Sequence, residues 1–427
     1  MPSAKLSEEK YLPRFIDATI RRKLGYAGAV EIRGPKWCGK TQSALQIAAS
    51  SLMMQDPDKR NDYRLLAETK PSLLLRGSAP RLIDEWQEAP QLWDAVRFAV
   101  DGESQPGRFM LTGSSTPTTP PSHSGAGRIV SVDMAPMALA ESRDSTCEVS
   151  LAALFDGAVD PVGYSSCDIE LMSHLICRGG WPRAVTTLSP EDSLEMAYDY
   201  VTTIAEQDIS RVDGVSRNPQ YARLIMREYA RLTSSQATQS TVIKDLKARD
   251  IDLSKETVNG YLAALRRLYV IQELSAWAPS LHAKSRIAKT PTRHFTCPSI
   301  AAAALGASPH SLLMDTSTMG LLFESLCVRD LMVYAQALGG EVLHYHDEAG
   351  READAVVQLR DGRYALFEMK LGASFVEEGA ESLKRLASTI DTAVMGAPAF
   401  CAVIIPGGFA ARREDGVLVL PITCLTA

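Results

Sequence analysis

The sequence predicts an α/β protein of several domains, organised around a core near its N-terminus. Two features carry this prediction: a complete glycine-rich phosphate loop between a short apolar strand and a helix, and a later apolar strand that ends in two adjacent acids. With 427 residues, the chain is too long for one ordinary hydrophobic core. We expect a P-loop ATPase core over residues 1–150, a helical lid over 151–235, a winged helix over 236–300 and a C-terminal α/β domain over 301–427.

The composition is that of a globular protein in a reducing compartment. Hydrophobic residues make up 45% and charged residues 22% of the chain, and no apolar run approaches the length of a membrane-spanning helix. The N-terminus lacks the apolar segment of a signal peptide, and the eight cysteines form no C-x-x-C pair, so we expect reduced thiols in the cytoplasm. The net charge of −6 gives no global signal for nucleic acid, so such binding must come from local patches.

The phosphate loop spans residues 34–41, which read G-P-K-W-C-G-K-T and match G-x-x-x-x-G-K-[ST]. A short strand at 29–32 precedes the loop and a helix at 42–48 follows it. Its glycines allow a tight turn with N–H groups aimed at a phosphate, Lys40 reaches the β- and γ-phosphates, and the Thr41 hydroxyl takes a Mg²⁺ position. We expect the whole loop to bind ATP: Gly34, Pro35, Lys36, Trp37, Cys38, Gly39, Lys40 and Thr41.

The second half of the ATPase site is predicted at Asp84 and Glu85, which end the apolar strand that begins near Arg81. Asp84 would hold Mg²⁺, directly or through water, and Glu85 would orient and deprotonate the attacking water. An isolated Asp-Glu pair at a strand end is most often only solvated. Because this pair follows a phosphate loop along the chain, at the spacing of a P-loop ATPase site, the catalytic interpretation is favoured.

A further strand at 109–113 ends in small hydroxyl residues. Ligands of parallel sheets lie at the carboxyl ends of the strands, so Ser114 or Thr112 would sense the γ-phosphate. Arg128, which enters the strand at 129–132, could stabilise phosphate charge in its own subunit or in a neighbouring one. The alternative for Arg128, a solvated surface arginine, has equal support.

The region after the predicted lid has the order of a winged helix-turn-helix. A short helix near 241–246 and a longer one at 254–268 lead into a strand at 269–274, with Ser254 as a plausible N-cap. A DNA-backbone patch and a protein-contacting winged helix both remain open, because the whole chain is acidic. The basic residues of the predicted patch are Lys244, Lys247, Arg249, Lys255, Arg266, Arg267, Lys284, Arg286, Lys289 and Arg293.

A second chemical centre is predicted in a hairpin over residues 350–370, whose turn centres on Asp361. This register sets Asp354 directly opposite Glu368, and Lys370 shares the face of Glu368 because side chains alternate along a strand. Two carboxylates would hold Mg²⁺, and the lysine would help to activate water or steady developing charge during phosphodiester hydrolysis. Glu324, on a helix over 321–334, could add a carboxylate or be an exposed helix acid.

The alternative for this hairpin is a cross-strand ion pair between Lys370 and one of the two acids. The apolar residues on either side imply burial, and three ionisable groups in a buried setting more often mark a site. We therefore favour the metal-dependent interpretation.

These segments together resemble a bacterial and archaeal family of AAA-type P-loop ATPases with a C-terminal restriction-endonuclease-like domain of uncharacterised role. The resemblance implies an AAA core, a winged helix and a PD-(D/E)xK nuclease-like fold. In that motif Asp354 matches the first acid, Glu368 the second acid and Lys370 the lysine, although alanine precedes Asp354 instead of proline. The resemblance covers nearly the whole chain and rests on 34–41, 82–85, 111–114, 179–182, 289–291, 323–324 and 354–370.

AAA proteins often form rings with sites between subunits, so the resemblance also implies a homo-oligomer in which a neighbour's arginine completes each site. The first function that we expect is an ATP-binding and ATP-hydrolysing protein with Mg²⁺-dependent, ATP-regulated DNA cleavage. The second is an ATP-driven switch or scaffold whose C-terminal domain binds nucleic acid or protein without cutting. A translocase has no supporting motif beyond the shared ATPase core.

Overall fold

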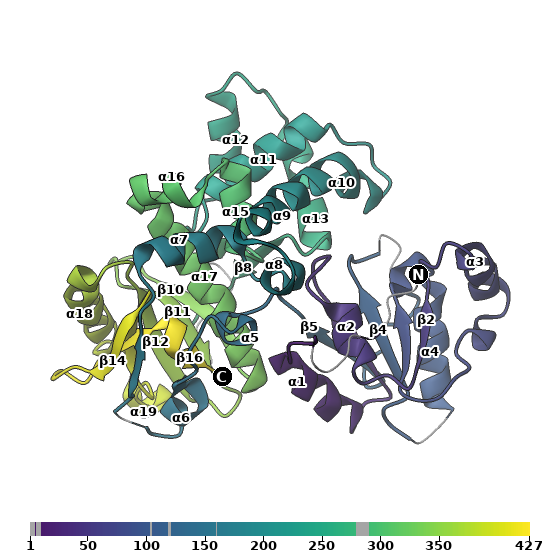
Figure 1. The fold of residues 1–427 in the computed structure, drawn as a ribbon, viewed down its shortest axis with the longest axis horizontal. Helices are drawn as coiled ribbons and strands as arrows, with labels where there is room; N and C mark the ends of the chain where they lie inside the picture. Colours follow the sequence, from purple (N-terminus) through teal and green to yellow (C-terminus); the bar gives the residue numbers. More distant parts are fainter. Residues whose placement is uncertain (1–4, 6–9, 103–104, 118–120, 159, 279–289) are drawn as a thin grey trace. The chain divides into compact units, whose positions relative to one another are not determined.

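The computed structural model describes residues 5, 10–102, 105–117, 121–158, 160–278 and 290–427 (Figure 1). Contacts between Cα atoms divide the chain into two compact units. Unit 1 contains residues 1–136, 208–216 and 264–269, and unit 2 contains the rest.

Unit 1 is built on a five-stranded parallel sheet with the strand order β2-β3-β4-β1-β5. Strand β4 therefore lies between the strand that enters the phosphate loop and the strand that ends in the two acids. All three carboxyl ends meet at one edge of the sheet. The strands are β1 Ala29–Arg33, β2 Ser50–Met53, β3 Arg81–Asp84, β4 Phe109–Gly113 and β5 Ile129–Asp133.

Helices cover both faces of this sheet because its strands are apolar on both sides. One face packs against α1 and α2 through residues such as Ile20, Ile32 and Ala44. The other face packs against α3 and α4 through residues such as Ala67 and Val96. The helices are α1 Phe15–Leu24, α2 Lys40–Leu45, α3 Arg60–Thr69 and α4 Gln91–Asp101, with short 3₁₀ turns at Pro71–Leu73 and Trp86–Glu88.

Two segments from much later in the chain belong to unit 1. The first, 208–216, contains α10 (Ile209–Arg211) and follows a π-helical turn at Ile204–Asp208. The second, 264–269, is the end of helix α13 and the residues after it. The Thr116 main-chain N–H donates to the Arg267 carbonyl at 3.0 Å, and the Thr116 and Tyr269 hydroxyls are 3.0 Å apart.

Unit 2 begins with a mostly helical region, as the sequence predicted for residues 151–235. Helix α11 closes this region. Helices α12 and α13 then lead into the antiparallel pair β8–β9, which is the order of two helices and a strand expected for 236–300. The elements are α5 Leu139–Ser142, α6 Leu151–Phe155, α7 Ile169–Arg178, α8 Pro182–Thr186, α9 Pro190–Thr203, α11 Pro219–Arg231, α12 Gln239–Lys247, α13 Lys255–Arg267, α15 Pro298–Leu305, α16 Pro309–Met314, β6 Val149–Ser150, β7 Gly163–Ser165, β8 Ile271–Leu274 and β9 Thr292–Phe295.

The C-terminal part of unit 2 is a mixed seven-stranded sheet with the order β10-β11-β12-β13-β15-β14-β7. Helix α18 packs on one face through Leu383 and Leu386, against Val356, Leu366 and Val403, and α17 lies on the other side of these strands (Figure 1). The elements are α17 Thr316–Ala337, β10 Glu341–His346, β11 Glu352–Gln358, β12 Tyr364–Met369, α18 Val376–Ala387, α19 Thr392–Met395, β13 Cys401–Ile405, β14 Gly408–Arg412, β15 Leu418–Pro421 and β16 Leu425–Thr426.

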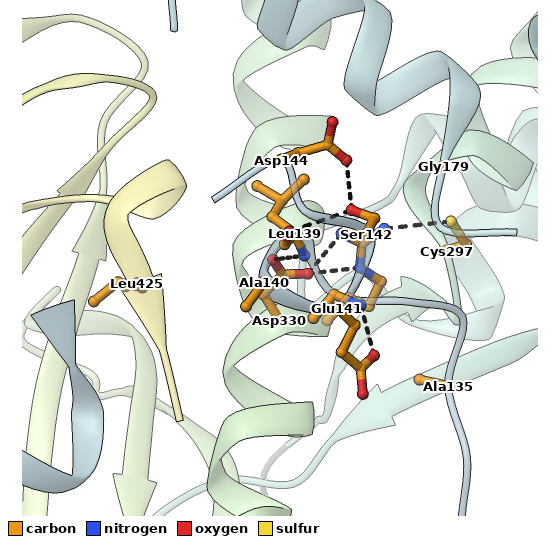
Figure 2. A network of polar contacts seen from close by, with 12 residues as sticks. Ala135, Leu139, Ala140, Glu141, Ser142, Asp144, Gly179, Cys297, Asp330 and Leu425 are labelled. Carbon is orange, nitrogen blue, oxygen red and sulfur yellow. Dashed lines mark hydrogen bonds and ion pairs between the residues drawn. The ribbon is translucent and has the colours of Figure 1, made fainter. Parts of the chain in front are cut away.

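The division differs from the boundary predicted at residue 150, because 137–150 belongs to unit 2. Two contacts explain the difference. Strand β6 pairs in parallel with β16 near the C-terminus. The N–H of Leu139, at the start of α5, donates to the fully buried Asp330 of α17 at 2.8 Å (Figure 2).

All eight cysteines are free thiols. Among the described residues, no helix combines the length and the apolar character needed to cross a bilayer.

Candidate functional site

The phosphate loop has the backbone conformation that its glycines permit. Gly34 has φ 154° and Gly39 has φ 106°, main-chain angles that residues with a side chain rarely adopt. A Cβ on Gly34 would lie 2.1 Å from the Met134 carbonyl oxygen, so this turn also needs the space that glycine leaves. The buried Lys40 ammonium donates to the carbonyls of Gly34 and Pro35, at 2.9 and 2.7 Å, and lies inside the loop.

The two predicted Mg²⁺ residues of unit 1 are in contact: Thr41 ends the loop, and Asp84 ends β3. The Thr41 hydroxyl donates to Asp84 Oδ1 at 2.7 Å, and the Thr112 hydroxyl donates to the same oxygen at 2.7 Å. Burial raises the pKa of Asp84, while both hydroxyl contacts oppose that rise. A cation at this position would favour the ionised carboxylate.

Glu85 lies next to Asp84 and is held by two polar side chains. Ser114 donates to Glu85 Oε2 at 2.6 Å, and the Gln87 amide contacts the same oxygen. Glu85 itself has φ 57°, a left-handed conformation that turns the chain sharply at the end of β3. The three strand ends therefore bring Lys40, Thr41, Asp84, Glu85 and Ser114 together, as the sequence predicted.

The loop residues between the glycines differ in their surroundings. Lys36 extends to Asp208, with its Nζ 2.6 Å from the buried carboxylate, and Trp37 is 49% exposed. Cys38 is fully buried, and its thiol lies 3.5 Å from the Met134 carbonyl oxygen.

The structure does not bring Arg128 to the phosphate loop of its own chain. Its carbonyl accepts from the N–H of Ala29, at the amino end of β1, whereas the loop follows the carboxyl end. Its guanidinium forms an ion pair with Asp101 at 2.6 Å. Within one chain this position agrees with the surface alternative, and a role in a neighbouring subunit stays a prediction.

The predicted C-terminal hairpin is confirmed by the register of β11 and β12. Gln358 pairs with Tyr364 and Ala355 with Phe367, so the turn centres on Asp361 and the next step sets Asp354 against Glu368. The sequence did not reveal a β-bulge on the other side of β11. Leu343 pairs with Val356 but Tyr345 pairs with Ala353, so β11 has one extra residue there.

The bulge contains Asp354, and this explains where its side chain lies. The carboxylate accepts from the N–H of Met369 at 2.7 Å. Glu368 is 1% exposed, and Lys370 Nζ is 3.3 Å from its Oε2. Its other oxygen, Oε1, has no hydrogen-bond partner among the described residues.

The electrostatics of this cluster disfavour charged carboxylates in the absence of a cation. Burial raises the pKa of Glu368, the nearby Asp354 adds to the rise, and Lys370 opposes it. Burial also raises the pKa of Asp354. The pKa of Glu324 lies well above its ordinary value because of burial and then because of the charges of Asp354 and Glu368.

Glu324 faces a cavity of about 260 Å³ that Asp354 also lines, together with Glu352, His344 and Ser234. Across the parts of the chain that the structure describes, no three or more His, Cys, Asp or Glu side chains are arranged to hold a metal ion. In this conformation Glu324 therefore does not form a three-carboxylate metal site with Asp354 and Glu368.

The predicted basic patch is only partly on the surface. Arg293 is 3% exposed, donates to the Ala237 carbonyl and lies over the Tyr229 ring. The prediction that Arg293 contacts a phosphate backbone is therefore wrong. Arg249 forms an ion pair with the buried Glu228 at 2.9 Å. Lys284, Arg286 and Lys289 lie outside the described residues.

Sequence reasoning missed three residues that contact the phosphate-loop site. Gln87 holds Glu85, Asp208 pairs with Lys36, and Arg14 donates to the carbonyl of Cys38 at 2.9 Å. Gln87, two residues after Glu85, could have been suspected from the sequence. The other two are distant from the motif along the chain, so no local signal marks them.

Comparison with known families identifies three segments. Residues 27–142 match the family described as an AAA domain. Residues 169–311 match a domain of unknown function, DUF8612, and residues 319–425 match another, DUF4143. The N-terminal segment is therefore an AAA-type P-loop ATPase domain.

Two mycobacterial proteins are similar over most of the chain. They are the uncharacterized protein Mb2031c of Mycobacterium bovis and the uncharacterized protein Rv2008c of Mycobacterium tuberculosis. Each is 28% identical over 372 residues, which is 86% of this chain and 76% of the relative. Among solved structures, the Walker-type ATPase PABY2304 of Pyrococcus abyssi matches 71% of this chain and 99% of its own, with 12% identity and a TM-score of 0.44.

Proposed function

We propose that this protein binds and hydrolyses ATP in unit 1 and cleaves phosphodiester bonds of DNA, with Mg²⁺, at the hairpin of unit 2. The ATPase half is supported by the family match and by the junction of Lys40, Thr41, Asp84 and Glu85 at one sheet edge. The cleavage half is supported by one observation above all: Asp354, Glu368 and Lys370 converge on adjacent strands.

In unit 1, each polar group has a distinct role in this proposal. Lys40 would leave the loop carbonyls and neutralise the β- and γ-phosphates, and Thr41 and Asp84 would hold Mg²⁺. Glu85 would accept the proton of the attacking water, with Ser114 and Gln87 fixing its carboxylate.

The carboxylates of unit 2 fit a magnesium ion. Mg²⁺ is commonly held by one or two carboxylates and keeps several waters, so Asp354 and Glu368 suffice without Glu324. The buried Oε1 of Glu368, which has no hydrogen-bond partner in the described parts of the chain, offers a coordination position. The ion would supply Lewis-acid stabilisation of the phosphodiester. Lys370 would orient the attacking water and steady the developing negative charge.

The test is cleavage of plasmid and linear DNA with Mg²⁺ or Mn²⁺, with and without ATP. Wild type is compared with Asp354→Ala and Lys370→Ala, and ATP hydrolysis is measured on the same samples. We expect both variants to lose cleavage and to keep ATP hydrolysis. Cleavage that persists in Lys370→Ala would refute the proposed site.

A second function, an ATP-driven switch whose C-terminal domain binds without cutting, is favoured by the 3.3 Å ion pair between Lys370 and Glu368. Such a pair also occurs in a purely structural hairpin. For a switch, we expect slow ATP hydrolysis, assembly that changes with nucleotide, and no cleavage under any metal condition. Fast, DNA-stimulated hydrolysis would count against the switch.

A further inference from the structure

A buried arginine at the start of α1 contacts the main chain of the phosphate loop. Arg14 is 6% exposed, and its guanidinium donates to main-chain carbonyls on two different segments. Nη1 donates to the carbonyl of Cys38 at 2.9 Å, and Nη2 donates to the carbonyl of Ala135 at 2.8 Å. One planar group therefore ties the phosphate loop to the segment that follows β5.

The contact with Cys38 fixes the orientation of the next peptide N–H. In a trans peptide the C=O and N–H groups point in opposite directions. When Arg14 holds the Cys38 carbonyl on its own side, the N–H of Gly39 must point to the other side, into the loop. In a phosphate loop these inward N–H groups are the ones that bind the phosphates.

Arg14 is itself held in place by neighbouring side chains. Asp17 accepts from the Arg14 main-chain N–H at 2.9 Å and from the Tyr11 hydroxyl. The Tyr11 and Ser43 hydroxyls are 2.7 Å apart, which ties the same cluster to α2 directly after the loop. The cluster thus contacts the loop at Cys38 and the helix that follows the loop.

We propose that Arg14 is a positioning residue for ATP binding: its guanidinium holds the Cys38–Gly39 peptide with the Gly39 N–H turned toward the phosphates. The proposal rests on the nucleotide site described above. Without Arg14, the Cys38 carbonyl is buried without its charged donor, and this peptide is free to rotate. Because the N–H contacts the phosphate in both the ground state and the transition state, the effect falls mainly on binding.

The experiment uses the full chain, with Arg14→Ala, Arg14→Lys and, as a matched control, Arg81→Ala. Arg81 also donates to a main-chain carbonyl, that of Leu74 at 3.0 Å, but at the amino edge of the same sheet. The readouts are Kd for MgATP by calorimetry, KM and kcat for hydrolysis, and the melting temperature. Arg14→Ala is also assayed with guanidinium chloride added far below denaturing concentration.

For Arg14→Ala, we expect Kd and KM to rise about tenfold or more, the effect of one charge-assisted hydrogen bond, while kcat changes little. Arg14→Lys keeps the charge but cannot hold both carbonyls, so we expect its Kd for MgATP to lie between those of the wild type and Arg14→Ala. Free guanidinium restores binding in Arg14→Ala, and Arg81→Ala loses thermal stability only.

Three results would overturn the proposal. The first is normal MgATP binding by folded Arg14→Ala, and the second is wild-type MgATP binding by Arg14→Lys. The third is a loss of MgATP binding in Arg81→Ala as large as in Arg14→Ala at an equal fall in melting temperature, because binding would then follow stability alone. The result for Arg14→Lys decides the matter if Arg14→Ala does not fold. Failure of the wild type to bind MgATP would instead remove the nucleotide site itself, and this inference with it.

Discussion

Glu85 is the residue whose replacement should separate ATP binding from hydrolysis. It follows Asp84, the proposed Mg²⁺ residue, and is held by Ser114 and Gln87. We expect Glu85→Gln to bind MgATP normally and to lower kcat by about 10²-fold or more, because the amide cannot accept a proton. Lys40→Ala is the contrasting variant, since it should lose binding. Hydrolysis at the wild-type rate by Glu85→Gln would show that another group activates the water.

His294 should give the unfolding free energy an acid-side dependence on pH. It is 1% exposed, neither ring nitrogen has a hydrogen-bond partner among the described residues, and burial lowers its pKa to about 3. The neighbouring His344 adds to the shift. A depressed pKa contributes stability that is fully present above the unfolded value near 6.5 and is lost as pH falls toward 3.

The check is urea unfolding of wild type and His294→Gln between pH 7 and pH 4. We expect the wild type to lose up to about 1.4 kcal/mol per pH unit more than the variant in this window. Parallel pH profiles for the two proteins would mean that His294 can be protonated in the folded state without cost.

At the residue scale, the sequence predicted the side chains that a motif defines, and the fold brought Lys40, Thr41, Asp84 and Glu85 together. It could not locate Arg14, because the guanidinium reaches the loop through tertiary packing. Arg128 shows the opposite difficulty: its charge suited a phosphate, but strand direction puts it at the far edge of the sheet.

At the element scale, α5 depends on a buried acid of α17. Asp330 is fully buried and accepts from the Leu139 N–H (Figure 2). It also forms an ion pair with Arg329 at 2.6 Å. Asp330→Ala would leave Arg329 buried without its counter-charge. We expect a loss of about 3–5 kcal/mol in unfolding free energy by urea denaturation.

The control for this prediction is Glu206→Ala, which removes an ion pair with Arg223 in which both side chains are largely exposed. Exposed pairs contribute about 1 kcal/mol or less, so this variant should unfold almost as wild type does. Equal costs for the two variants would contradict a special role of Asp330.

The hairpin of β11 and β12 was predictable because a turn signal and alternating apolar residues define its register. The bulge at Asp354 was not, because an extra residue in one strand leaves no trace in the alternation of that strand alone. It arises from pairing with β10, whose register only the folded sheet defines.

At the scale of the whole molecule, unit 1 is assembled from three separate stretches of chain. A fragment of residues 1–150 would lack Asp208 and Tyr269 and would therefore lose the partners of Lys36 and Thr116. We expect the fragment to melt at a lower temperature than the ATPase unit of the full chain. Calorimetry of both proteins, with MgATP added, measures the difference. Equal melting temperatures would show that the later segments are dispensable.

The predicted domain limits followed the linear sequence, and linear limits cannot represent a unit that recruits residues 208–216 and 264–269. The element order along the chain was predictable because periodicity and turn residues are local properties. The return of later segments to the core depends on buried side chains such as Asp208, whose partner lies far away in the sequence.

The three-stretch construction of unit 1 also has a consequence for synthesis on the ribosome. Chains usually fold from the N-terminus as they emerge. Here the last piece of the N-terminal unit is the stretch that ends at Tyr269. The nascent ATPase unit therefore stays incomplete while the residues that link its three stretches are translated. Its folding can be completed only after Tyr269 has left the ribosome.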